Sequence, residues 1–380
     1  MNTVPYKEEH IIFRESFRRF LQKEIIPHVE EWEGEGIVPR WAWKRLGENG
    51  FLCTSVPVEY GGQGADFLYS AILIEEMARA NFYGLSARLH SDVVVPYVVQ
   101  FATEQQKKKY LPKCVSGEII MAIAMTEPHA GSDVAGIKAT AVEDGNYFVL
   151  NGQKTFISNG INCDLVIVAA KDPEEKNPHV AVDLFLVEAD TPGFEKGKML
   201  KKIGWRSQDT AELFFFDCRI PKANRLGEKG TGFKKLMTNL QQERLICTLG
   251  AQTAAEFMLE ETIRYCRQRE VFGKTLARYQ NTQFALAEMA AEVKIGRTFI
   301  DKLIIEHWQR KTIVTDVSMA KFWITEMACR VADRCLQLFG GYGYCEEYPI
   351  ARAWRDIRVT RILAGSNEIM KLIVAKDMTK

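Results

Sequence analysis

The chain has 380 residues, and its 50 Lys and Arg against 49 Asp and Glu leave a formal net charge of +1. This length corresponds to two or three domains of about 100–200 residues, and the balanced charge argues against a nucleic-acid partner. Hydrophobic residues make up 47% of the chain and charged residues 26%, as in an ordinary globular protein.

The segment from residue 8 to about 117 has apolar residues at helical spacing. The pattern is clear in Ile12, Phe13, Phe17, Phe20 and Leu21. Such spacing is typical of one helix face, while the Gly- and Pro-rich stretch 57–64 and Pro96 indicate loops or helix starts. We therefore predict a helical domain over residues 1–118.

The middle of the chain changes to short β-branched and aromatic runs. These runs cover 147–150, 165–169, 180–187 and 212–216, and Asp-Gly, Asn-Gly and Pro-Gly pairs separate them. Because such pairs form hairpin turns, we predict an antiparallel β domain over 119–231. Long helical patterns then return at 232–268, 280–310, 314–339 and 367–378, which predicts a helical domain over 232–380.

Several classes of protein are not supported by the sequence. No apolar stretch approaches the roughly 18–20 residues that cross a bilayer. The nine cysteines include no C-x-x-C pair, and the histidines have no metal-ligand spacing, so we expect reduced thiols and no metal. The N-terminal segment lacks a signal-peptide pattern. We expect a cytoplasmic bacterial protein or a processed organellar matrix protein that is not secreted.

One carboxylate interrupts an apolar stripe of the predicted helix 232–268. Steps of three and four residues connect Leu236, Leu240, Glu243, Cys247 and Gly250. Burial raises the pKa of a carboxyl group toward neutrality, which suits a general base. The spacing alone leaves open that Glu243 faces water and pairs with a cation. The same spacing predicts that the neighbouring Arg244 lies on the surface.

Short motifs in chain order resemble those of the acyl-CoA dehydrogenase family. Residues 126–133 read TEPHAGSD, which is similar to the family signature T-E-P-x-A-G-S-D. Further matching stretches lie at 151–160, 221–233, 269–274 with Gln280 and Gln283, 337–343 and 365–369. Together they span essentially the whole chain. The resemblance is therefore a full-length one.

The resemblance implies a mainly α fold with an N-terminal helical domain, an antiparallel β-barrel-like domain and a C-terminal four-helix bundle, assembled as a homotetramer. It also implies FAD bound without a Rossmann fold. The implied FAD-binding residues are Thr126, Ser132, Phe156, Ser158, Arg269, Phe272, Gln280, Gln337, Gly341, Ser366 and Glu368. The implied substrate-binding residues are Ser132, Arg244 and Gly365.

The position of the catalytic base separates branches of this family. Many members have Glu before the Gly of the C-terminal motif, where this chain has Ala364. The long-chain and isovaleryl branch carries the base in a Glu-Arg pair on the long helix, which Glu243 and Arg244 match. The resemblance thus implies that Glu243 removes the α-proton of an acyl-CoA. It further implies hydride transfer to flavin N5, a trans-2-enoyl-CoA product and an electron-transfer flavoprotein as acceptor.

Two other positions bear on the implied chemistry. The backbone N–H of Ala364 can still donate to the thioester carbonyl, whatever its side chain. Asp92 stands where many family members carry an apolar residue of the acyl pocket. It either caps a helix or faces solvent, or it faces the acyl group as a second acid or base. The last case would suit an alicyclic or branched acyl-CoA, with 1,4-dehydrogenation as one outcome.

Two alternatives to a dehydrogenase also remain. One is an oxidase that returns electrons to oxygen. The other is a non-catalytic flavoprotein that binds nucleic acid. Some relatives within the family resemble such a protein. The net charge of +1 and the retained pair Glu243 and Arg244 argue against nucleic-acid binding.

Overall fold

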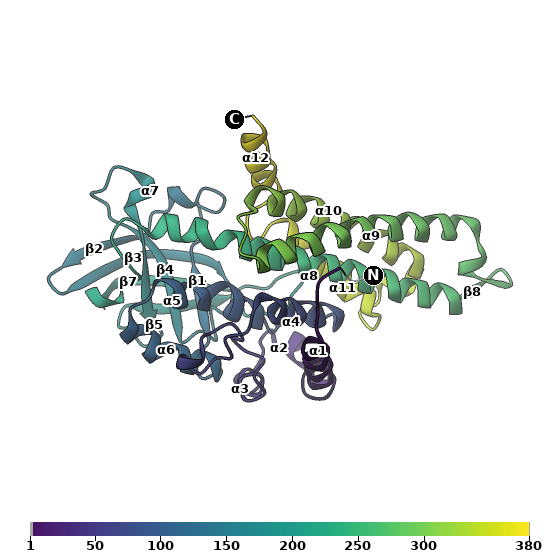
Figure 1. Ribbon diagram of the computed structural model, residues 1–380, viewed down its shortest axis with the longest axis horizontal. Helices are drawn as coiled ribbons and strands as arrows, with labels where there is room; N and C mark the ends of the chain where they lie inside the picture. Colours follow the sequence, from purple (N-terminus) through teal and green to yellow (C-terminus); the bar gives the residue numbers. More distant parts are fainter. Residues whose placement is uncertain (1–2, 380) are drawn as a thin grey trace.

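The computed structural model describes residues 3–379, and it confirms the order of helical, β and helical regions (Figure 1). The N-terminal helices are α1 (Glu8–Phe20), α2 (Val29–Glu35), α3 (Arg40–Glu48), α4 (Phe67–Arg79), α5 (Val95–Phe101) and α6 (Glu104–Val115). A π-helical turn, η4 (Leu89–Val94), leads directly into α5. Residues 90–94 of this turn are buried, so η4 belongs to the interior and not to the surface.

The central region is one seven-stranded sheet. Its strands are β1 (Met121–Ala124), β2 (Thr140–Asp144), β3 (Tyr147–Ile157), β4 (Leu165–Lys171), β5 (Val182–Glu188), β6 (Phe194–Met199) and β7 (Ala211–Pro221). They lie in the order β1-β4-β2-β3-β7-β6, and β5 pairs with β4. Most pairs are antiparallel, as predicted, but β1 and β2 both pair with β4 in parallel. The β2–β3 hairpin lies between β1 and β4 in sequence, and this long connection returns the chain to the same end of the sheet.

The C-terminal region contains the longest helices. These are α8 (Gly232–Gln268), α9 (Gln280–Trp308), α10 (Val314–Phe339), α11 (Pro349–Ile357) and α12 (Asn367–Met378). The short α11 was not predicted. Helices α8, α9 and α10 extend away from the sheet, and the small hairpin β8 (Glu270–Val271) and β9 (Lys274–Thr275) lies at the far end (Figure 1). The molecule is therefore elongated, with the sheet at one end and this hairpin at the other.

Two observations concern membrane-spanning helices and the state of the cysteines. Within residues 3–379, no helix is both long and apolar enough to span a membrane. All nine cysteines are free.

Candidate active site

Glu243 lies in the buried part of α8, and its side chain is held by a tyrosine. Only 6% of Glu243 is exposed. The hydroxyl of Tyr97, a fully buried residue of α5, donates a hydrogen bond of 2.9 Å to Glu243 Oε1. Burial raises the pKa of Glu243 to about 7, while the Tyr97 hydrogen bond and the charge of Arg244 oppose this rise. A carboxyl group with this pKa can accept a proton near neutral pH.

Arg244 is buried, so the prediction that it lies on the surface was wrong. Its exposed fraction is 5%. All residues of α8 from 243 to 255 are buried, because other elements cover this part of the helix on every side. Helical spacing therefore cannot separate an inner face from an outer one here. The Arg244 Nε has no hydrogen-bond partner within the described chain, which leaves a donor available to a ligand.

Asp92 is also buried, at 5% exposure in η4, so it does not face solvent. Burial raises the pKa of Asp92 to about 6, and a hydrogen bond with Ser70 and the charge of Arg88 oppose this rise. Its backbone carbonyl accepts a hydrogen bond of 2.6 Å from the side chain of Gln242. The Asp92 backbone is thus next to the residue that precedes Glu243, while the Asp92 carboxyl bonds with Ser70 of α4.

Ala364 and Gly365 form a strained turn before α12. Both have positive φ angles, of 55° and 87°, and this conformation is uncommon for alanine. The buried Nζ of Lys321 donates to the Gly365 carbonyl at 2.7 Å and to Asn367 Oδ1 at 3.0 Å. The Ala364 N–H has no backbone acceptor among residues 3–379. The turn is thus fixed while its N–H remains available.

A second group of predicted residues lies on the β domain. The Thr155 N–H donates to the Thr126 carbonyl at 2.9 Å, which brings Thr126 next to the end of β3. Phe156 is 67% exposed and has a φ of 57°. Ser158 follows β3 and is half-buried, while Ser132 is exposed. An exposed aromatic ring on a strained backbone is typical of a ligand site.

A third group, which we call the distal cluster, lies at the far end of the long helices. Arg269, Gln337 and Gly341 line a cavity of about 530 Å3 there, and the Arg269 guanidinium lies 5.3 Å from the ring centre of Tyr342. A side-chain carbon added at Gly341 would meet no atom within 4 Å. In addition, Phe272 on the hairpin is 98% exposed. Gln280, at the start of α9, is also exposed.

The structure does not bring all predicted FAD-binding residues together within one chain. The distal cluster and the β domain lie at opposite ends of the molecule (Figure 1). Ser366 caps the N-terminus of α12, and Glu368 is exposed in its first turn. Exposed aromatic rings suit stacking with a flavin or adenine ring, and arginine beside open glycine backbone suits a pyrophosphate. The chemistry of these residues therefore fits FAD, and they form separate groups on the β domain and in the distal cluster.

Comparisons with known proteins agree with these features. The family models for the acyl-CoA dehydrogenase N-terminal, middle and C-terminal domains match residues 7–118, 122–218 and 230–379. The chain belongs to the acyl-CoA dehydrogenase family. Members of this family are FAD-dependent oxidoreductases that dehydrogenate acyl-CoA, and this protein is such an enzyme.

Three relatives show how similar the chain is to other acyl-CoA dehydrogenases. The mitochondrial long-chain specific acyl-CoA dehydrogenase of Sus scrofa is 46% identical, and the match covers 98% of this chain and 87% of that protein. The mitochondrial isovaleryl-CoA dehydrogenase of Pongo abelii is 36% identical over 97% of this chain and 88% of that protein. The crystal structure of an acyl-CoA dehydrogenase from Geobacillus kaustophilus has 55% identity and a TM-score of 0.97, covering 100% of both chains.

Two residues of the candidate site were not identified from the sequence. Tyr97 contacts Glu243 across 146 residues of chain, and Lys321 reaches Gly365 across 44. Neither contact has a local signature, because both join elements that meet only in the folded protein. A charged residue on the buried face of α10 was the one available signal for Lys321.

Proposed function

We propose that this acyl-CoA dehydrogenase oxidises its substrate between the α- and β-carbons to a trans-2-enoyl-CoA, with Glu243 as the base that removes the α-proton. The observation that supports this role is the buried Glu243 carboxyl, with a pKa of about 7 and a hydrogen bond from Tyr97. A base with this pKa is about half ionised at neutral pH and gains a proton readily.

The turn before α12 would activate the substrate. The free Ala364 N–H donates to the thioester carbonyl oxygen and stabilises the negative charge that develops there when the α-proton leaves. Lys321 acts as a positioning residue, because its bond to the Gly365 carbonyl fixes this turn. Gly365, Ser132 and the open donor of Arg244 would bind the rest of the thioester and CoA.

We further propose how the chain holds FAD. Thr126, Ser132, Phe156 and Ser158 of the β domain would surround the flavin ring. The distal cluster of a second copy, with Phe272 and Gln280, would hold the pyrophosphate and adenine, and Ser366 and Glu368 would add contacts. When bound, FAD supplies two-electron oxidation by accepting the β-hydrogen as a hydride. The separation of the two residue groups within one chain supports an oligomer, which we propose is a homotetramer.

An electron-transfer flavoprotein is the proposed electron acceptor. A second candidate function concerns the acyl group, and the buried Asp92 supports it. An acid in this position suits dehydrogenation of an alicyclic or branched acyl-CoA, including 1,4-dehydrogenation, since it could exchange a proton with a more distant carbon.

The test is an anaerobic titration of the FAD-loaded protein with straight, branched and cyclic acyl-CoA thioesters, following the absorbance of oxidised flavin. Wild type should be bleached by one class. Glu243→Gln should keep FAD and bind CoA esters but reduce the flavin about 10²–10⁴-fold more slowly. Glu260→Gln, an exposed change on the same helix, serves as the control. Equal rates in wild type and Glu243→Gln would refute the assignment of the base.

A result without any bleaching would favour a different class of protein. In that case, salt-dependent retention of DNA would support the non-catalytic, nucleic-acid-binding flavoprotein.

A further inference from the structure

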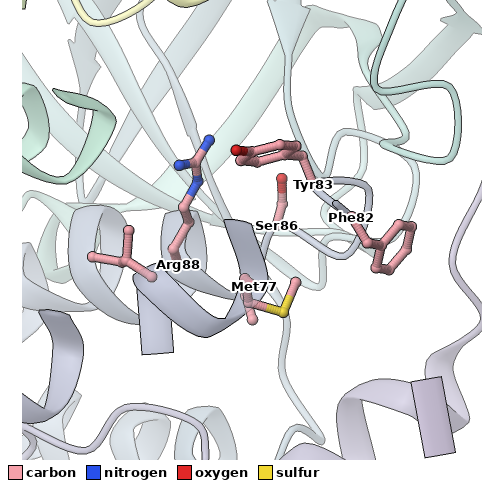
Figure 2. Close-up of a pocket in the computed structure, with 7 residues that line it drawn as sticks. Met77, Phe82, Tyr83, Ser86 and Arg88 are labelled. Carbon is pink, nitrogen blue, oxygen red and sulfur yellow. The ribbon is translucent and has the colours of Figure 1, made fainter. Parts of the chain in front are cut away.

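One cation near the candidate active site has no acceptor on the protein. The half-buried guanidinium of Arg88 lies 5.3 Å from the ring centre of Tyr83 and 5.1 Å from that of Trp205. Among residues 3–379, no hydrogen bond or ion pair satisfies its nitrogens. Figure 2 shows its side chain beside Tyr83, at a small and mainly apolar cavity of about 10 Å3.

Arg88 and Tyr97 lie at opposite ends of a segment that packs along α8. Residues 88–97 run antiparallel to α8, so that Tyr97 contacts Glu243 at one end and Arg88 meets Gly250 at the other. A side-chain carbon added at Gly250 would lie 2.6 Å from Arg88 Nη1. The guanidinium therefore occupies the space beside α8 that a larger residue at position 250 would fill. The Tyr83 hydroxyl donates to the Gly250 carbonyl at 3.2 Å and closes this end.

The distance between the two ends suits an acyl chain. Glu243 and Gly250 are seven residues apart on one face of α8, which is about 10 Å along the helix. A carbon chain with bonds of about 1.5 Å advances roughly 1.3 Å per carbon. An acyl group that has its α-carbon at Glu243 and follows α8 toward Gly250 would therefore reach Arg88 after about eight carbons.

The unsatisfied guanidinium would distinguish between acyl groups. Water can satisfy its donors while the site is empty. An alkyl chain that displaces this water leaves the donors without acceptors, which is unfavourable in a half-buried place. A carboxylate at the end of the chain restores the hydrogen bonds and neutralises the charge. Asp92 does not fill this role, because its carboxyl bonds with Ser70 and makes no ion pair with Arg88 in the described structure.

We propose that Arg88 is a specificity-determining residue at the far end of the acyl site, where it selects acyl-CoA substrates that carry a carboxylate at the end distant from the thioester. This inference rests on the proposed function, since the acyl group is placed by the role of Glu243.

The test compares pairs of thioesters with equal chain length, for example suberyl-CoA with octanoyl-CoA and sebacyl-CoA with decanoyl-CoA. Wild-type holoenzyme should have a kcat/KM at least about tenfold higher for the dicarboxylic member. Arg88→Met should reverse this preference, with a change in the ratio of about a hundredfold. The control Arg79→Met removes a half-buried arginine of α4 that forms ion pairs with Glu256 and Glu260, and it should leave the ratio unchanged.

Two results would overturn the role of Arg88: a wild-type preference for the alkyl member of every pair, or an equal loss on both members in Arg88→Met. The wild-type ratio does not depend on how the variant folds, and Arg88→Lys, which keeps the charge but loses the planar fork, offers a second comparison. Flavin reduction by alkyl thioesters alone would refute only this inference. If no thioester reduced the flavin, the proposed function itself would fail.

Discussion

Replacing Tyr97 by Phe removes one hydroxyl group and leaves the buried ring in place. The lost bond joins the hydroxyl to Glu243 Oε1 at 2.9 Å, between two buried residues. A hydrogen bond to an ionised group stabilises it by about 1.5–3 kcal/mol, and 1.36 kcal/mol corresponds to one pKa unit. The pKa of Glu243 should therefore rise from about 7 by about 1 to 2. At neutral pH the ionised fraction, and with it kcat/KM, should fall about 5- to 50-fold.

The assay for this prediction is kcat/KM across the pH range in which the enzyme is stable. Because Glu243 acts in its ionised form, activity should increase with pH through the pKa. Tyr97→Phe should move the midpoint upward and approach the wild-type rate at high pH. Tyr110→Phe removes a different hydroxyl, bonded to Glu188, and should leave the midpoint in place. A uniform loss at every pH would refute the reasoning and indicate a merely structural tyrosine.

Three further substitutions test neighbouring parts of the site. Glu243→Gln should raise Tm more at about pH 8 than at about pH 5. The pKa of Glu243 is raised from 4.5 to about 7, which lowers the stability of the folded protein by about 3 kcal/mol at a pH where this carboxyl is ionised in both the folded and the unfolded protein. Equal increases in Tm at the two pH values would contradict this reasoning. Lys321→Met should lower the free energy of unfolding by about 1–3 kcal/mol in denaturant titrations and reduce kcat in steady-state kinetics. The control Lys371→Met, at an exposed lysine, should change neither quantity. Asp92→Asn should alter turnover only if Asp92 faces the acyl group, and normal kinetics on branched and cyclic thioesters would exclude such a role.

The long elements were the most predictable part of the fold. The predicted range 314–339 coincides with α10, and 232–268 coincides with α8. Each carries a repeating pattern over many turns, and glycine or proline lies near the ends. The parallel pairing of β1 with β4 was not predictable in this way. Strand partners that are far apart in sequence leave no periodic signal.

The site was predictable where one motif contains its residues, and not where the fold assembles them. The pair Glu243 and Arg244 is visible in the sequence, but the spacing placed Arg244 on the surface. That error arose because α8 is enclosed by other elements, so both of its faces are interior. Tyr97 and Arg88 contact α8 from a distant segment of the chain. Their roles depend on tertiary packing that no local pattern encodes.

The chain is elongated, with the sheet at one end and the β8–β9 hairpin at the other (Figure 1). In the proposed oligomer, this shape ties cofactor retention to assembly. If two copies share each flavin, a subunit that dissociates gives up both its own ring contacts and its neighbour's phosphate contacts. Dilution would then release FAD and separate subunits in a single concentration-dependent process. A mutation at a subunit contact would also resemble a defect in flavin binding, even far from any residue that touches the cofactor.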